Sequence, residues 1–171
     1  MRRNWRPRFR PQFRPRCREV DFTGCKLVLV CGNALLTYLR DDRPGLPWPG
    51  RWDLPGGGRE GDETPEACVL RELAEEFGLH LPPGRLEWRR VWPSMLDPRR
   101  RSVFFAGRIL EAEIAAIRFG CEGQVWRMMA VEAFLAHPLA VPELQRRVGV
   151  ALGELRWLQG AGVCQRQRSS W

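Results

Sequence analysis

Three glutamates lie close together in the stretch between residues 64 and 79. Glu72, Glu75 and Glu76 are spaced i, i+3 and i+4, which places their side chains on one arc if the segment is helical. Like charges at such spacings destabilise a helix by roughly a few tenths of a kcal/mol per pair, and the segment contains no lysine that would offset them. Clustered carboxylates are the hard oxygen ligands that Mg²⁺ and Mn²⁺ prefer. The pattern therefore indicates either a metal site or an acidic surface.

The ends of this segment carry residues that start and stop helices. Thr64 is a preferred N-cap, Pro65 suits the first helical position, and Gly78 is a natural stop. These signals predict a helix over residues 65–77. We interpret Cys68, which shares the arc of the glutamates, as a small packing residue rather than a soft metal ligand. The predicted apolar arc consists of Ala67, Leu70, Leu73, Ala74 and Phe77.

A glycine-rich loop at residues 56–58 precedes the predicted helix. Glycine lets the backbone approach a ligand closely and offer its carbonyl and amide groups. The loop lacks the lysine of a phosphate-binding P-loop, so that class of site is excluded.

Loop and helix together resemble the Nudix box, G-x5-E-x7-R-E-U-x-E-E-x-G-U, where U is a bulky aliphatic residue. A chance match of this length has a probability on the order of 10⁻⁷. The chain is therefore identified as a member of the Nudix hydrolase family, which implies an α/β fold, an α/β/α sandwich with a mixed β-sheet. All nine specified positions are filled, by Gly57, Glu63, Arg71, Glu72, Leu73, Glu75, Glu76, Gly78 and Leu79.

The resemblance implies roles for individual residues. It implies that Glu72, Glu75 and Glu76 bind Mg²⁺, with Mn²⁺ as a substitute, and that Glu75 and Glu76 are catalytic. The carbonyl of Gly56 is a further implied metal ligand. The implied reaction is attack of water on phosphorus in a nucleoside diphosphate linked to another group. The resemblance implies a mainly structural role for Gly57, Glu63, Arg71 and Gly78.

Many members of the family need an acid or base from outside the box. Glu122 is the best candidate, because Glu122 followed by Gly-Gln resembles the MutT-type branch, where such a glutamate supplies a metal or base contact. The alternative is an ordinary turn glutamate. Glu111 and Glu113 are weaker candidates for the same role.

Residues that would bind the substrate carry a weaker signal. Arg51 and Arg100 could meet phosphates, and Trp52 and Trp92 could stack on a base, as could Trp48 and Trp88. Buried core positions are the alternative for the tryptophans, and a solvated loop is the alternative for the arginines.

Elimination favours a nucleoside triphosphate, including an oxidised one, as the substrate, because the patterns of the NADH-pyrophosphatase and coenzyme A subgroups are missing. Three alternatives stay open. The chain could remove pyrophosphate from RNA 5′ ends, cleave ADP-ribose or nucleotide sugars, or be a non-catalytic Nudix fold that binds a nucleotide or RNA.

The elements that must position the box are mostly predicted strands. Two apolar runs, residues 26–30 and 34–40, flank Gly32-Asn33 and predict a hairpin. Further strands are predicted at residues 85–93, 101–110 and 124–130, and helices at 131–136 and 142–158. Strands bracketed by helices fit helices packed on both sides of a mixed sheet.

Charge separates the chain into a basic end and a nearly neutral body. The net charge is +8, and residues 1–20 hold eight arginines against Glu19, a net of +7, which leaves +1 for the rest. We expect residues 1–19 to be a disordered Arg/Pro-rich arm, residues 20–160 the Nudix domain and residues 161–171 a C-terminal tail. The arm is either a weak RNA-binding segment or a functionless extension.

Composition bounds the setting of the protein. No run of eighteen apolar residues is present, so we expect no membrane span, and a cytoplasmic location is the default. The six cysteines and two histidines lack zinc-ligand spacing. A nucleotide is the expected partner, and a homodimer stays open.

Overall fold

The computed structural model describes residues 20–155. The predicted arm at 1–19 and tail at 161–171, and the last residues of the predicted domain, lie outside the described residues. Within them, six strands form one sheet, which is mixed, as predicted. Its order is β3-β2-β1-β5-β4, with β6 on β2, and only β1 and β5 run parallel. The strands are β1 (Cys25–Cys31), β2 (Ala34–Leu39), β3 (Trp52–Asp53), β4 (Leu86–Pro93), β5 (Arg101–Arg108) and β6 (Val125–Ala130).

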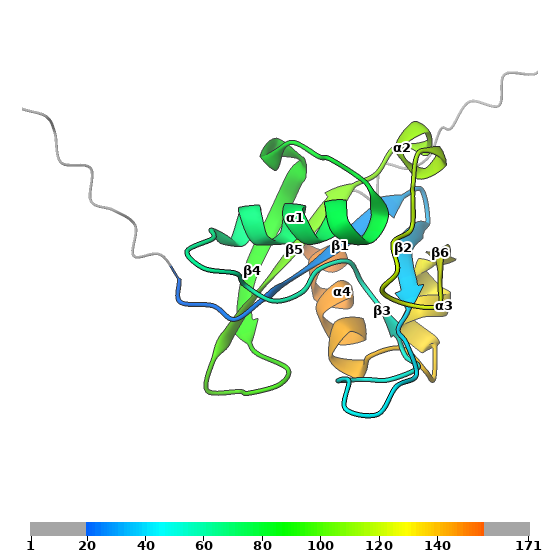
Figure 1. Cartoon of the computed structure of the whole chain (residues 1–171). Helices are drawn as coiled ribbons and strands as arrows, with labels where there is room; N and C mark the ends of the chain where they lie inside the picture. Colours follow the sequence, from blue (N-terminus) through cyan, green and yellow to red (C-terminus); the bar gives the residue numbers. More distant parts are fainter. Residues whose placement is uncertain (1–19, 156–171) are drawn as a thin grey trace, which may run out of the picture.

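Helices cover both faces of the sheet, which confirms the predicted three-layer architecture. Figure 1 shows α1 crossing the near face over β1 and β5, while α4 lies behind the sheet. No helix within residues 20–155 is long and apolar enough to cross a membrane. The helices are α1 (Pro65–Phe77), the 3-10 turn η1 (Pro83–Arg85), α2 (Glu111–Ala115), α3 (Val131–Ala136) and α4 (Pro142–Glu154).

Successive side chains of β1 point to opposite faces of the sheet and pack in two separate core clusters. Leu27 and Leu29 pack on the α1 side, whereas Val28 and Val30 pack on the α4 side. All four side chains are buried, and burying each contributes about 1.5–3 kcal/mol. The sheet therefore holds α1 and α4 at fixed positions on opposite sides.

A gap between β1 and β2 decides where the glycine loop lies. The two strands pair directly only near their turn, where Val30 lies opposite Leu35. Farther from the turn, residues 52–57 fill the space: β3 pairs with the end of β2, and Pro55 and Gly57 accept hydrogen bonds from the N–H groups of β1. The glycine loop is thus held against β1 by backbone hydrogen bonds.

Most predicted elements are found within one or two residues. The hairpin turn at Gly32-Asn33 and the box helix agree with the sequence analysis, and α3 spans the predicted residues 131–136. β3 and the short α2 were not predicted. The predicted helix over 142–158 ends at Glu154, where the described chain leaves helical geometry.

Candidate active site

Local signals place α1 as predicted. The Thr64 hydroxyl accepts a hydrogen bond from the Ala67 N–H at 3.2 Å. Gly78 adopts a left-handed conformation with φ 66° and donates its N–H to the Ala74 carbonyl at 2.9 Å. Its buried face differs from the predicted arc, because Ala67 is exposed while Cys68 and Glu76 point into the protein. One of the three glutamates is therefore buried rather than on a surface stripe.

Arg71 connects the glycine loop to α1. Its Nε donates to Glu63 Oε1 at 2.7 Å, and one Nη donates to the Gly58 carbonyl at 2.8 Å. The carboxylate of Glu63 also accepts the Glu60 N–H at 3.0 Å. The hydrogen bond from Arg71 lowers the pKa of Glu63. An ion pair between Arg71 and Glu63 thus fixes the turn between loop and helix.

Glu76 is buried beneath the glycine loop. Its side chain accepts the Gly56 N–H at 2.9 Å, and the residue is only 4% exposed. Burial raises its pKa to about 7, and the nearby Asp53 and Glu72 carboxylates add to the rise, while Lys26 and the Gly56 N–H oppose it. The negative charge of Glu76 is therefore only partly compensated by the protein.

Glu72 lies against the next glycine. A Cβ atom at Gly57 would come within 2.5 Å of its Oε1, so only glycine leaves room for this carboxylate. Burial raises the pKa of Glu72, although Arg71, with an Nη at 3.1 Å, opposes the shift. Two carboxylates with raised pKa values thus face one glycine loop.

Glu75 is oriented differently. It is exposed, and its Oε2 accepts a hydrogen bond from Arg71 at 2.8 Å. Within residues 20–155, no three Asp, Glu, His or Cys side chains are grouped as a metal site. The candidate ligands, the glutamate carboxylates and the loop carbonyl, offer oxygen atoms, which suit Mg²⁺ or Mn²⁺. Among the described residues, the Gly56 carbonyl takes part in no hydrogen bond, so it is available as a further oxygen ligand.

Three charged residues that the sequence analysis did not select lie beside this loop. Asp53 is buried and accepts hydrogen bonds at Oδ2 from Lys26 Nζ at 3.0 Å and from Arg40 at 2.8 Å. Its Oδ1 accepts the Leu54 N–H at 2.7 Å, and the Tyr38 hydroxyl lies 3.5 Å from Oδ2. Asp53 thereby fixes two cations near Glu76. A lone lysine in a predicted buried strand is the signal that would have identified Lys26.

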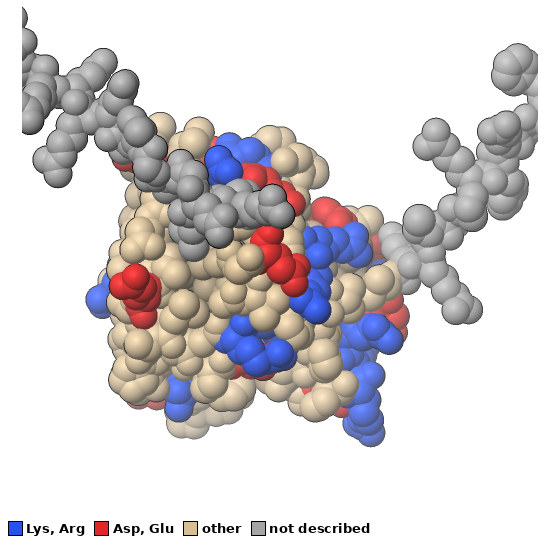
Figure 2. Space-filling view, turned by 180° about the vertical axis from the view of Figure 1, so that it is seen from behind, with Lys and Arg blue, Asp and Glu red and all other residues tan. Residues whose placement is uncertain are grey.

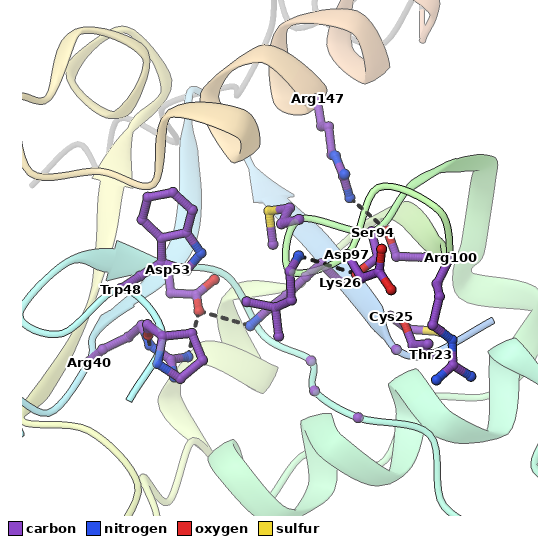
Figure 3. Close-up of a pocket in the computed structure, with 18 residues that line it drawn as sticks. Thr23, Cys25, Lys26, Arg40, Trp48, Asp53, Ser94, Asp97, Arg100 and Arg147 are labelled. Atoms are coloured by element: carbon purple, nitrogen blue, oxygen red, sulfur yellow. Dashed lines mark hydrogen bonds and ion pairs between the residues drawn. The ribbon is translucent and has the colours of Figure 1, made fainter. Parts of the chain in front are cut away.

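A cavity of about 460 Å³ opens between the glycine loop and two other loops. Figure 3 shows Lys26, Arg40 and Asp53 on one side of it and Arg100, Asp97 and Ser94 on the other. Four cationic side chains line the cavity against two carboxylates, which makes it suited to an anionic ligand. The cations are Lys26, Arg40, Arg100 and Arg147, and the carboxylates are Asp53 and Asp97.

Comparison with known proteins agrees with the geometry of loop and helix. The family model described as the NUDIX domain matches residues 27–148. The chain belongs to the Nudix family. Nucleoside triphosphatase NudI of Escherichia coli O139:H28 is 32% identical over 119 residues, which cover 70% of this chain and 80% of that protein.

Two further proteins are similar to the chain, one in the sequence of a segment and one in structure. Human m7GpppN-mRNA hydrolase NUDT17 is 36% identical over 96 residues, 55% of this chain and 29% of the relative. The chain spans half or less of several curated relatives that it matches. The MutT protein of Methanosarcina mazei Go1 superposes with a TM-score of 0.61 at 18% identity, covering 80% of this chain and 96% of that one, which shows a shared fold.

Some of the predicted substrate-binding residues line the cavity, and others lie outside it. Arg100 lines the cavity, as does Trp48. Trp52 is 4% exposed and packs in the core on the α4 side, so its ring is not available for stacking on a base. Arg51 lies outside the cavity lining and contacts the carbonyls of Pro138 and Ala140, both at 3.4 Å.

Trp92 also lies outside the cavity lining. The guanidinium groups of Arg90 and Arg146 lie 5.0 Å and 4.4 Å from its ring centroid, and Arg147 lies at 5.5 Å. Arginines rather than a base thus occupy the surroundings of this ring. The alternative of a structural tryptophan describes Trp92 and Trp52 better than stacking does.

Glu122 is exposed and lies beside a separate small hollow of about 170 Å³. Tyr38 and Arg40 line that hollow too, and Arg40 also lines the main cavity. Residues 118–120 reach the end of α1, where the Gly120 N–H donates to the Glu76 carbonyl at 2.8 Å. Glu122 thus lies near the Nudix site, and its role stays a prediction.

Two other candidates, Cys68 and Glu113, have structural contacts within the protein. Cys68 is fully buried in the α1-side core, and its thiol contacts the Gly58 carbonyl at 3.4 Å, which agrees with its interpretation as a packing residue. Glu113 binds Arg85 at 3.0 Å, so this weaker candidate for the base is held in an ion pair.

Proposed function

We propose that this Nudix chain is a pyrophosphohydrolase that cleaves a phosphoanhydride bond of a nucleoside triphosphate. The observation that carries the proposal is a pair of carboxylates, the buried Glu76 and the partly buried Glu72, facing a glycine loop at the edge of a cationic cavity. In the reaction, water adds to phosphorus, the bond to the bridging oxygen breaks, and the leaving phosphate takes the electron pair.

The carboxylates of Glu72, Glu75 and Glu76 and the Gly56 carbonyl would hold Mg²⁺, with Mn²⁺ as a substitute. A bound divalent ion polarises the phosphate and lowers the pKa of water. The raised pKa values of Glu72 and Glu76 support this assignment, because buried carboxylates that lack full compensation favour a cation. Glu75 would have to exchange its contact with Arg71 for the ion.

The chain's own cations would position the substrate. Asp53 fixes Lys26 and Arg40 on the glycine-loop side of the cavity, and Arg100 stands on the opposite wall. Side chains that are already ordered lose little entropy when they bind phosphate oxygens. We assign Lys26, Arg40 and Arg100 to the phosphate chain, and we keep Glu122 as the candidate for the base.

A nucleoside triphosphate is the substrate class we favour, and the similarity to nucleoside triphosphatase NudI over most of its length supports it. RNA with a 5′ triphosphate is the second candidate, because two bacterial RNA pyrophosphohydrolases match parts of this chain and residues 1–19 are rich in arginine. On the face that Figure 2 shows, basic and acidic side chains lie interspersed, so that face offers no broad basic track for RNA.

The proposal is tested with a panel of nucleotides in the presence of Mg²⁺, followed by identification of the products. The panel contains normal and oxidised triphosphates, ADP-ribose and triphosphorylated RNA. Glu76→Gln should lower turnover at least ~10²-fold, because it removes a charge from the metal site. Glu66→Gln is the matched control on the same helix, since Glu66 pairs with Arg89 outside the box. Unchanged turnover in Glu76→Gln contradicts the proposal.

Deleting residues 1–19 separates the two substrate classes. If RNA is the substrate and the arginines bind it, deletion should weaken RNA turnover strongly at physiological salt and leave free triphosphates unaffected. Equal RNA turnover before and after deletion would exclude the arm as the RNA anchor.

A further inference from the structure

Two indole N–H groups within residues 20–155 are buried without a hydrogen-bond partner, those of Trp48 and Trp92. Buried donors are nearly always paired, because leaving one unpaired costs the free energy of desolvating it. Trp92 lies outside the cavity lining, under arginine side chains. Trp48 lines the cavity. The same orphaned group thus occurs once in the candidate site and once away from it.

The backbone holds Trp48 in an unusual conformation. Its φ is 56°, and it is the one non-glycine residue in the described part of the chain with a positive φ. A tryptophan in the left-handed region is strained, and such strain is concentrated at functional sites. Pro49 disfavours the right-handed helical region for the residue before it, and the Pro47 carbonyl is fixed by Arg40 Nε at 2.9 Å. The backbone is therefore restricted on both sides of Trp48.

The direction of the indole points to a ligand. In Figure 3, its nitrogen lies on the edge that faces Lys26 and the other labelled residues of the cavity. The remaining donors with long reach, Lys26, Arg40 and Arg100, are cationic and suit phosphate. The Trp48 N–H is neutral, and its ring packs against the apolar core on the α4 side. A neutral donor suits a neutral acceptor, such as a carbonyl oxygen of a nucleobase.

We propose that the Trp48 N–H is a specificity determinant that donates a hydrogen bond to a carbonyl oxygen of the bound nucleobase. The inference rests on the proposed function only in taking the ligand to be a nucleotide. It adds that nucleotides with a base carbonyl at the right position bind better than those without it. The loss of one neutral hydrogen bond corresponds to about a three- to tenfold change in affinity.

Nucleoside monophosphates test the inference without turnover, because they contain no phosphoanhydride bond. Dissociation constants are measured by calorimetry with Mg²⁺ for three pairs that differ by one carbonyl and the ring N–H that accompanies it. The pairs are inosine and purine riboside monophosphate (C6), 8-oxo-dGMP and dGMP (C8), and UMP and its 4-deoxy analogue (C4). In the wild-type protein, the carbonyl-bearing member of at least one pair should bind about three- to tenfold more tightly.

Trp48→Phe and Trp92→Phe form the matched variants, since both remove an orphaned N–H and keep an aromatic ring. Trp48→Phe should abolish the preference for the carbonyl-bearing member and leave the affinity for the other member nearly unchanged. Trp92→Phe should retain the wild-type preference. Comparing the two ligands within one variant corrects for any general loss of packing.

Three results would overturn the inference. They are a wild-type protein that shows no preference in any pair, a Trp48→Phe variant that keeps the preference, and a Trp92→Phe variant that loses it equally. The wild-type comparison needs no variant, so a Trp48→Phe protein that fails to fold does not prevent the test. Hydrolysis of triphosphates without any carbonyl preference would keep the proposed function and reject the role of Trp48.

Discussion

The helices α1 and α4 lie on opposite faces of the sheet, have thirteen residues each, and begin with a proline in the first turn. Both bury a charged side chain, Glu76 in α1 and Arg147 in α4. Arg147 is 1% exposed and donates to Glu143 at 3.0 Å, to the Ser102 hydroxyl at 3.0 Å and to the Pro93 carbonyl at 2.7 Å. Glu76 accepts one backbone N–H.

This difference separates a charge that holds the fold together from a charge that binds something. Arg147 connects α4 to both ends of the loop between β4 and β5, and its three hydrogen-bond partners oppose the effect of burial, which still lowers its pKa. Glu76 keeps a raised pKa because the protein supplies too few donors. A cation that binds beside Glu76 would supply the missing compensation, whereas Arg147 already has three partners within the protein.

Titration of Glu76 should show the largest effect. Its folded-state pKa of about 7 lies above its ordinary value of 4.5, so the folded protein holds more protons than the unfolded chain between these values. The stability of the metal-free protein should therefore fall as the pH rises through this window, by about 3 kcal/mol. Urea unfolding at pH 4.5 and pH 8 measures the change.

Glu76→Gln should remove this contribution to the pH dependence, and Glu66→Gln should retain it. Because Mg²⁺ competes with the proton, the ion should stabilise the wild-type protein more at pH 8 than at pH 4.5. The same pH dependence in wild-type protein and Glu76→Gln would show that the charge on Glu76 is already compensated.

Arg147→Met should destabilise the protein by about 2–3 kcal/mol, because it removes hydrogen bonds of a buried charged group. Arg146→Met is the control: Arg146 shares the Glu143 carboxylate, but its side chain is 55% exposed, so the loss should stay below about 1 kcal/mol. Denaturant unfolding midpoints compare the two. Equal losses in both variants would contradict a special structural role for Arg147.

Gly57→Ala should lower the affinity for Mg²⁺ about tenfold or more, because the new Cβ would displace the Glu72 carboxylate. Gly58→Ala is a matched neighbour, since its Cβ would have no atom within 4 Å. Calorimetric titration with Mg²⁺ or Mn²⁺ measures both. If the two variants bind metal equally well, the Glu72 carboxylate does not contribute from its observed position.

Glu63→Gln should have the smallest effect, a loss of about 1 kcal/mol seen as a lower melting temperature, because it weakens the ion pair with Arg71. Glu60→Gln is the control, since Glu60 is 74% exposed and lies 3.9 Å from Arg71. A larger loss in Glu60→Gln than in Glu63→Gln would reject Glu63 as the residue that fixes the turn.

The sequence predicts the box region well because its signals are local. Thr64, Pro65 and Gly78 mark the ends of α1, and Gly32-Asn33 marks the hairpin. Each of these signals acts between residues that are near one another in the chain. The sequence therefore predicts the types and bounds of these helices and strands, and it identifies the box residues.

The sequence predicts the wall of the cavity less well, because this wall is formed by residues that are distant in the chain. Lys26, Arg40 and Asp53 meet only because residues 52–57 fill the gap between β1 and β2. Periodicity does not reveal such a gap, and the two-residue β3 is too short to show a pattern. The choice between stacking and a core position for Trp52 also depends on distant residues, since its burial follows from strand pairing and packing against α4.

The segment at residues 41–50 leaves and rejoins the sheet at one point. Arg40 N–H donates to the Arg51 carbonyl at 3.0 Å, and the Gly50 N–H donates to the Asp41 carbonyl at 3.2 Å. A loop closed at its base in this way tolerates changes of length and composition at small cost. The segment that carries Trp48 can thus be replaced by another loop. Such a replacement would change which ligands the cavity binds, while Asp53 and the glycine loop keep their positions beside the sheet.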